Sequence, residues 1–128
     1  MTPALADSLR TAKACLIDAA VLSTVPRVAA REAYLAAYHA AEAYVFHCTG
    51  KIAKTHSGLR SEFNRLAKGE PRIGRDLVQF LSTAYELKSI ADYNTNPGTR
   101  ITADQAQDAI ATATRFVSVI EEMIGTPT

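Results

Sequence analysis

The sequence contains a long alanine-rich stretch without glycine or proline, VAAREAYLAAYHAAEAYVFH, which covers residues 28–47. Alanine favours helices and nothing in the stretch breaks one, so it predicts a helix. One face of this helix carries, at steps of four, four and three, Tyr34, Tyr38, Glu42 and Val45, with Arg31 one turn earlier. Because small alanine side chains let neighbouring helices approach closely, we expect this helix to lie at the centre of the fold. Its polar row then needs partners.

Caps and apolar spacing predict four more helices around the central one. Thr2-Pro3 marks the start of the first helix, and Thr102 with Gln105 forms a capping box before the last. Gly50 is a C-cap signal for the central helix, and residues 94–98 form a loop signal. The predicted helices cover residues 3–21, 26–49, about 57 or 58 to 68, a segment from near 73–76 to about 93, and 103 to about 125.

The helices predict the fold class. No segment alternates polar and apolar residues with a period of two, so no strand is predicted. We expect an all-α fold, an antiparallel bundle of four long helices with one short helix inserted, in a single domain of residues 1–128. A hydrophobic fraction of 48% in 128 residues suffices for a core without disulfides or metal.

Charge, cysteine spacing and hydropathy exclude several classes of protein. A formal net charge of +1 argues against a strongly basic nucleic-acid binder, although a local basic patch remains open. Cys15 and Cys48 lack zinc-type spacing and are predicted to be reduced, buried thiols. No apolar run is long enough for a membrane span and no signal peptide is visible, so we expect a cytoplasmic location.

The first candidate site is the polar row of the central helix, where Tyr34 and Tyr38 accompany Arg31 and His39. Two interpretations are open for this row. It can face a pocket or a dimer interface, or the tyrosines can pack in the core with their hydroxyls reaching the surface.

The second candidate is the segment Lys54-Thr55-His56-Ser57-Gly58, which leads into the third predicted helix. A Ser or Thr at such a position usually only caps the helix. The backbone amides that open a helix also favour an anion, however, and Lys54 and His56 lie beside them. The segment can therefore serve only as a helix cap, or it can also form part of a functional site.

The third candidate is Ala91-Asp92-Tyr93, at the end of the fourth helix. A carboxylate at a helix C-terminus opposes the helix dipole, so we expect Asp92 to have a cationic partner or a role in a site. The three histidines and two cysteines show no ligand spacing, so neither a metal nor a cofactor is predicted.

Three pieces of the sequence, taken together, resemble the HEPN family (higher eukaryotes and prokaryotes nucleotide-binding domain). They are EAYLAAYHAA at 32–41, KTHSG at 54–58 and ADY at 91–93. The corresponding pieces of small stand-alone prokaryotic members read Arg-Ala-Tyr-Tyr-Ala-x-Phe-His-Ala-Ala, Lys-Thr-His-Ser-Gly and Arg-x-x-Ala-Asp-Tyr. The order of the pieces is the same, and the number of helices fits the whole chain.

The resemblance implies a helical bundle, commonly dimeric, and often paired with a minimal nucleotidyltransferase in toxin–antitoxin systems. Active members cut RNA without a metal, through an Arg-x4–6-His pattern at the dimer interface. No arginine of this sequence is followed by a histidine at that spacing, and Glu32 and Lys88 stand where the small members have arginine. The sequence therefore favours a binding module over the ribonuclease of the family.

Three functions follow as expectations. The first is a HEPN-like binding module that acts as a homodimer with a nucleotidyltransferase, RNA or a nucleotide. The alternatives are a metal-independent endoribonuclease with Arg31, His39 and His56 as catalytic residues, and a purely structural dimer. We expect these three residues to converge with Asp92, with Tyr34, Tyr38 and Tyr93 nearby. These four and Lys54 are the candidates for a ligand-binding pocket.

Overall fold

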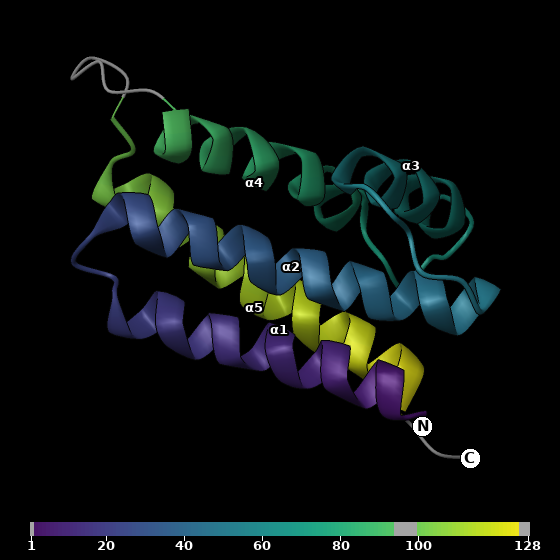
Figure 1. Ribbon diagram of the computed structural model, residues 1–128. Coiled ribbons are helices and arrows are strands. Elements are labelled where there is room, and N and C mark those ends of the chain that lie inside the picture. The colour runs from purple at the N-terminus through teal and green to yellow at the C-terminus, as the bar shows by residue number, and fades with distance from the viewer. Residues whose placement is uncertain (1, 94–99, 126–128) are drawn as a thin grey trace.

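The computed structural model describes residues 2–93 and 100–125, and every regular element in them is a helix (Figure 1). The helices are α1 (Pro3–Val21), α2 (Pro26–Thr49), α3 (His56–Ala67), α4 (Arg75–Tyr93) and α5 (Ala103–Gly125). The predicted all-α bundle of four long helices and one short helix is confirmed. Helix α3 begins at His56, one or two residues earlier than predicted, and ends at Ala67, one residue earlier than predicted.

The chain begins and ends these helices where the sequence provides caps. The Thr2 hydroxyl accepts a hydrogen bond from the Leu5 amide at 3.3 Å. Thr102 and Gln105 exchange the two hydrogen bonds of a capping box, at 2.9 and 3.1 Å. Gly50 ends α2 with a φ of 73°, in the left-handed region that favours glycine. These local signals account for most of the helix bounds.

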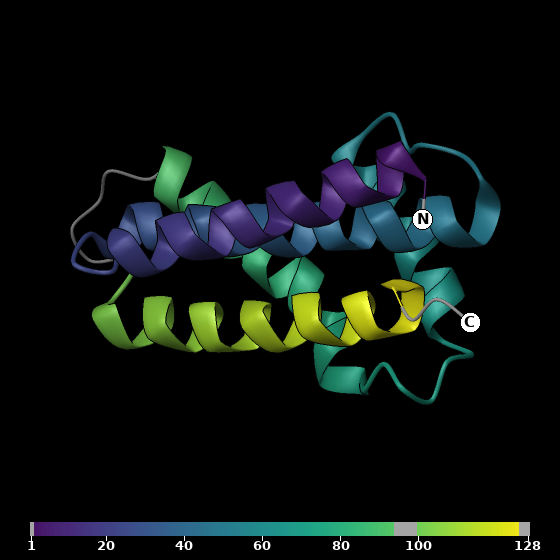
Figure 2. The same cartoon turned by 90° about the horizontal axis from the view of Figure 1, so that it is seen from below.

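Helix α2 lies at the centre of the molecule and contacts all four other helices. Its alanines are buried on several sides, which lets α1, α4 and α5 pack closely around it. Figure 1 shows α1 on one side of α2 and α3 and α4 on the other, and Figure 2 shows α5 running alongside α1 and α2. The central position predicted for this helix is confirmed, and it brings the polar row of α2 against α3 and α4.

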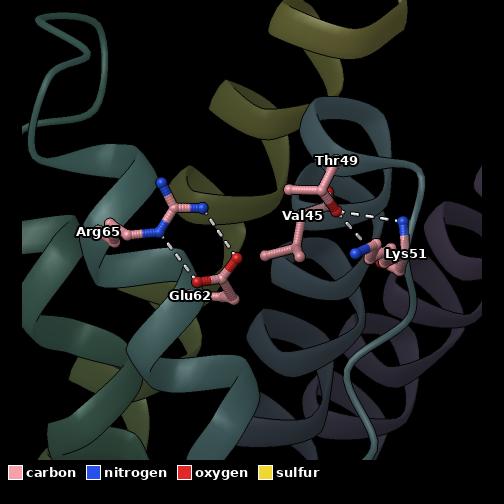
Figure 3. A network of polar contacts seen from close by, with 5 residues as sticks. All are labelled: Val45, Thr49, Lys51, Glu62 and Arg65. Carbon is pink, nitrogen blue, oxygen red and sulfur yellow. Dashed lines mark hydrogen bonds and ion pairs between the residues drawn. The ribbon is translucent and has the colours of Figure 1, made fainter.

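The connection from α2 to α3 is held at its start by the last turn of α2. The Thr49 hydroxyl donates to the Val45 carbonyl at 2.8 Å and accepts from the Lys51 amide at 3.1 Å (Figure 3). On α3, Arg65 donates two hydrogen bonds of 2.9 Å to Glu62, an exposed pair on the same helix. The fixed turn after Thr49 directs the chain back along α2, so that α3 begins beside the middle of the central helix.

The two cysteines differ in burial. Cys15 is buried as predicted, and burial and the nearby Glu32 raise the pKa of its thiol to about 11. The prediction of a buried thiol is wrong for Cys48, which is exposed. The buried part of α2 stops at Val45, and the final turn of the helix, which carries Cys48, extends beyond the core. None of the helices in the described residues is long and apolar enough to cross a membrane.

Candidate functional site

A buried tyrosine and an exposed histidine form the centre of the site. Tyr34 on α2 is completely buried, while His56, the first residue of α3, is exposed. The Tyr34 hydroxyl lies 2.5 Å from Nδ1 of His56. Burial raises the pKa of Tyr34 to about 12, so the hydroxyl keeps its proton and can donate it to Nδ1. This arrangement leaves Nε2 as the N–H of the histidine ring.

Two further tyrosines complete an aromatic group around His56. The ring of Tyr38 stacks on the His56 ring at a centroid distance of 4.4 Å and an angle of 25°. Tyr85 of α4 meets Tyr34 edge to face at 5.5 Å. We call Tyr34, Tyr38, His56 and Tyr85 the tyrosine–histidine cluster. Since its rings come from α2, α3 and α4, the cluster exists only in the folded bundle.

Two cations border the tyrosine–histidine cluster. The Arg60 guanidinium lies over the Tyr85 ring, 3.9 Å from its centroid. Lys88, one turn after Tyr85 on α4, is the second. Burial first, and then the charges of Lys88 and Arg60, lower the pKa of His56, so these two cations reach the exposed ring electrostatically. The imidazole is therefore held neutral near pH 7.

The Lys54–Gly58 segment acts as a cap for α3. The Thr55 hydroxyl accepts a hydrogen bond from the Gly58 amide at 2.9 Å. A Cβ on Gly58 would lie 2.9 Å from the same hydroxyl oxygen, so only glycine leaves room for this cap. Lys54 is exposed and makes no ion pair with a described residue. The capping interpretation thus accounts for Thr55 and Gly58, and His56 is the member that reaches the cluster.

Asp92 has the cationic partners that its position at a helix end predicted. Its carboxylate lies 2.7 Å from Lys88 Nζ and 3.7 Å from Arg31 Nη1, with 18% of the side chain exposed. The hydrogen bond to Asp92 raises the pKa of Lys88. Tyr93, the next residue, is 82% exposed and shares no ring contact with the described aromatic residues. Asp92 therefore belongs to an ion-pair network, and Tyr93 lies outside it.

His39 has a polar contact of its own. Its Nδ1 lies 3.4 Å from a Glu42 carboxylate oxygen, which also accepts from the Ser8 hydroxyl at 3.3 Å. The hydrogen bond from His39 lowers the pKa of Glu42. The His39 ring also meets Tyr38 edge to face at 5.2 Å. His39 and His56 thus lie against the same tyrosine ring.

The structure places most of the predicted site residues in two linked groups. One holds His56 with Tyr34 and Tyr38, and His39 lies at its border. The other is the ion pair of Arg31 with Asp92. Lys88 joins them, because it binds Asp92 and acts on the His56 ring. Lys54 and Tyr93 lie outside both groups.

A hollow of about 530 Å³ lies at the end of the bundle, where α2 begins and α4 ends. It is lined by Val25, Pro26, Arg27, Ile90, Ala91, Asp92, Arg100 and Ile101. Asp92 is the one site candidate that borders it, so the hollow is distinct from the tyrosine–histidine cluster. We favour the cluster over the hollow as the site, because the cluster joins a titratable ring to cations from two other positions.

The structure adds three residues that were not among the predicted site residues: Arg60, Tyr85 and Lys88, the last named above only as standing where the small HEPN members have arginine. Their spacing gave a usable signal. Arg60 follows His56 by four residues, and Lys88 precedes Asp92 by four, so each pair shares a helix face. Tyr85 precedes Lys88 by three on the same helix. The sequence does not show which of these faces meet, because that depends on how α3 and α4 pack against α2.

Comparison with known families agrees with the helical fold. The model of the HEPN domain family matches residues 5–123, nearly the whole chain. All of the candidate residues lie inside the matched range. No curated protein matches the chain. Among the described residues, His, Cys, Asp and Glu side chains form no group of three that could hold a metal ion.

Proposed function

The chain belongs to the HEPN domain family, and on that premise we propose that it is a helical binding module for RNA or a nucleotide. The binding site is the tyrosine–histidine cluster. The observation that carries the proposal is the exposed His56 ring, fixed between the Tyr38 ring and the buried Tyr34 hydroxyl and bordered by Arg60 and Lys88. Rings offer surfaces for bases, and the cations attract phosphate.

The exposure of His56 argues against a purely structural role for the cluster. A polar group that only supports the core is normally buried and satisfied within the protein. His56 is instead an exposed residue, although its ring is held by a completely buried tyrosine. Fixing an exposed ring in one orientation costs side-chain entropy, and it favours ligands that need the ring pre-oriented.

The test is the affinity for a short single-stranded RNA, measured by fluorescence anisotropy. His56→Ala should lower the affinity about tenfold or more, since base stacking contributes about 1–3 kcal/mol. His47→Ala, which changes the exposed histidine near the end of α2, is the matched control and should bind like the wild type. Equal affinities for the His56 and His47 variants, with both melting like the wild type, would contradict this function.

A second candidate function is metal-independent cleavage of RNA. It is favoured by the contact of both His39 and His56 with the Tyr38 ring. Histidines can exchange protons near neutral pH, and Arg31 could stabilise a phosphate transition state. Arg31 is held by Asp92, however, and His39 by Glu42, so each would have to exchange a partner for substrate. RNA cleavage in the presence of a chelator that is lost in His39→Ala would favour this function over binding alone.

One end of the bundle offers a surface for a protein partner. Among the described residues, six large apolar side chains are exposed, and all but Ile52 belong to the end of α1, the turn that follows or the end of α4: Ile17, Val21, Leu22, Val25 and Tyr93. Figure 1 shows these segments at the same end of the molecule. Exposed apolar groups of this kind mark interaction sites. In our proposal the single-domain chain acts in the cytoplasm as a homodimer, with a nucleotidyltransferase partner in a toxin–antitoxin-type pair.

A further inference from the structure

Arg60 is an arginine whose charge has no carboxylate partner among the described residues. Its guanidinium makes no ion pair with any carboxylate in that part of the chain. Its Nη1 atom is buried and has no hydrogen-bond partner, and it is the one such side-chain atom in residues 2–93 and 100–125. A buried donor without an acceptor is costly, and native structures usually supply one or leave the place to a bound group.

The surroundings of Arg60 hold the guanidinium, which also interacts with the Tyr34 hydroxyl, but they give its Nη1 atom no acceptor. The Tyr85 ring lies under it at 3.9 Å and supports the cation through its π face. Such a contact attracts the charge but accepts no N–H hydrogen bonds in the guanidinium plane. The side chain is half-buried, so part of it is open to a molecule approaching the cluster.

A comparison with Lys88 isolates what is unusual about Arg60. Both cations act on the His56 ring. Lys88 is paired with Asp92 at 2.7 Å, and Arg31 approaches the same carboxylate. Glu42, the next carboxylate toward the cluster, is engaged by His39 and Ser8. Arg60 is therefore the one of these three described cations that has no carboxylate partner.

We propose that Arg60 binds a phosphoryl group beside His56, so that the cluster takes a ligand with a terminal phosphate, such as a nucleoside monophosphate or an RNA end. This inference rests on the proposed function and names its ligand class. A guanidinium forms paired, charge-assisted hydrogen bonds with phosphate oxygens, which a lysine ammonium cannot reproduce. The fixed His56 ring presents its Nε2–H as a further donor to the same group.

The test follows the His56 ring resonances by NMR while inorganic phosphate, adenosine 5′-monophosphate or adenosine is added. In the wild type the monophosphate should bind at least about tenfold more tightly than adenosine. It should also raise the pKa of His56, because an anion next to the ring favours the imidazolium. Equal binding of adenosine and its monophosphate would overturn the inference without any variant being needed.

Two substitutions of Arg60 and one control sharpen the test. Arg60→Met keeps the apolar stem and should remove the preference for the monophosphate, whereas Arg60→Lys should keep only part of it. Arg65→Met, on the exposed face of α3, should bind like the wild type. If the monophosphate binds Arg60→Met as it binds the wild type while His56→Ala loses it, the Arg60 inference fails and the proposed function stands. If none of the three probes perturbs His56, the monophosphate site is excluded, and the RNA-binding experiment decides the function separately.

Discussion

At the scale of single residues, the hydrogen bond from Tyr34 to His56 connects the core to the surface. Tyr34→Phe removes the hydroxyl from a completely buried ring and leaves Nδ1 of His56 without its partner. We expect a loss of about 1 kcal/mol in the free energy of unfolding, as for a typical intramolecular hydrogen bond. Urea denaturation measures it. Tyr93→Phe, which changes an 82% exposed tyrosine, is the control and should leave stability unchanged. A Tyr34→Phe protein as stable as the control would show that the bond contributes nothing.

The lowered pKa of His56 predicts a pH dependence with a definite sign. Burial and the charges of Lys88 and Arg60 lower the folded pKa below the ordinary 6.5, so the unfolded chain binds the proton more tightly. Stability from this group is thus fully present above pH 6.5 and is lost as the pH falls through the folded pKa. The free energy of unfolding, measured near pH 7.5 and near pH 5.5, should fall less in His56→Gln than in the wild type. Identical pH dependence in the two proteins would contradict the pKa assignment.

At the scale of the helices, Gly50 is a position where the backbone requires glycine. Its φ of 73° is left-handed, and a Cβ there would meet no atom within 4 Å, so any cost of a side chain is conformational. Gly50→Ala should lower the free energy of unfolding by about 1–2 kcal/mol. A Cβ on Gly69 would also meet open space, but Gly69 has no positive φ, so Gly69→Ala should be nearly neutral or slightly stabilising. Thermal unfolding compares the two variants, and equal melting temperatures would refute the role of Gly50.

The helices could be predicted from the sequence because their signals are local. Thr2, Gly50 and Thr102 each act through hydrogen bonds or backbone angles within a few residues, and such signals can be read along the chain. The end of α2 was harder to interpret. Cys48 lies on a regular helix, but its exposure depends on how far the neighbouring helices extend, which no local pattern records.

The candidate site could be predicted only in part, because it combines residues from three helices. The polar row on α2 and the importance of His56 were visible in the sequence, and so was the need of Asp92 for a cation. The identity of that cation was not: Lys88 and Arg31 both reach it, from α4 and α2. Arg60 lies at the cluster because the 50–55 connection places α3 beside the middle of α2. No local pattern in the sequence predicts the course of that connection.

At the scale of the whole molecule, the exposed apolar end predicts self-association. Light scattering at micromolar concentration should give a mass near twice the 13.8 kDa of the chain. Val21→Glu places a charge among exposed apolar side chains and should shift the mass toward that of the monomer. Ile52→Glu changes the exposed apolar residue of the α2–α3 connection and should leave the mass unchanged. A wild-type mass equal to the monomer would contradict the homodimer.

The central claim is that the tyrosine–histidine cluster, rather than the hollow at the end of the bundle, binds the ligand. Amide and histidine-ring chemical shifts of the labelled protein, recorded while a 5′-phosphorylated single-stranded RNA is added, test it most directly. The account predicts that the largest shifts fall on His56, Arg60 and Tyr38. It is contradicted if the largest shifts fall instead on Arg27 and Arg100, which line the hollow, or if saturating RNA leaves His56 unchanged.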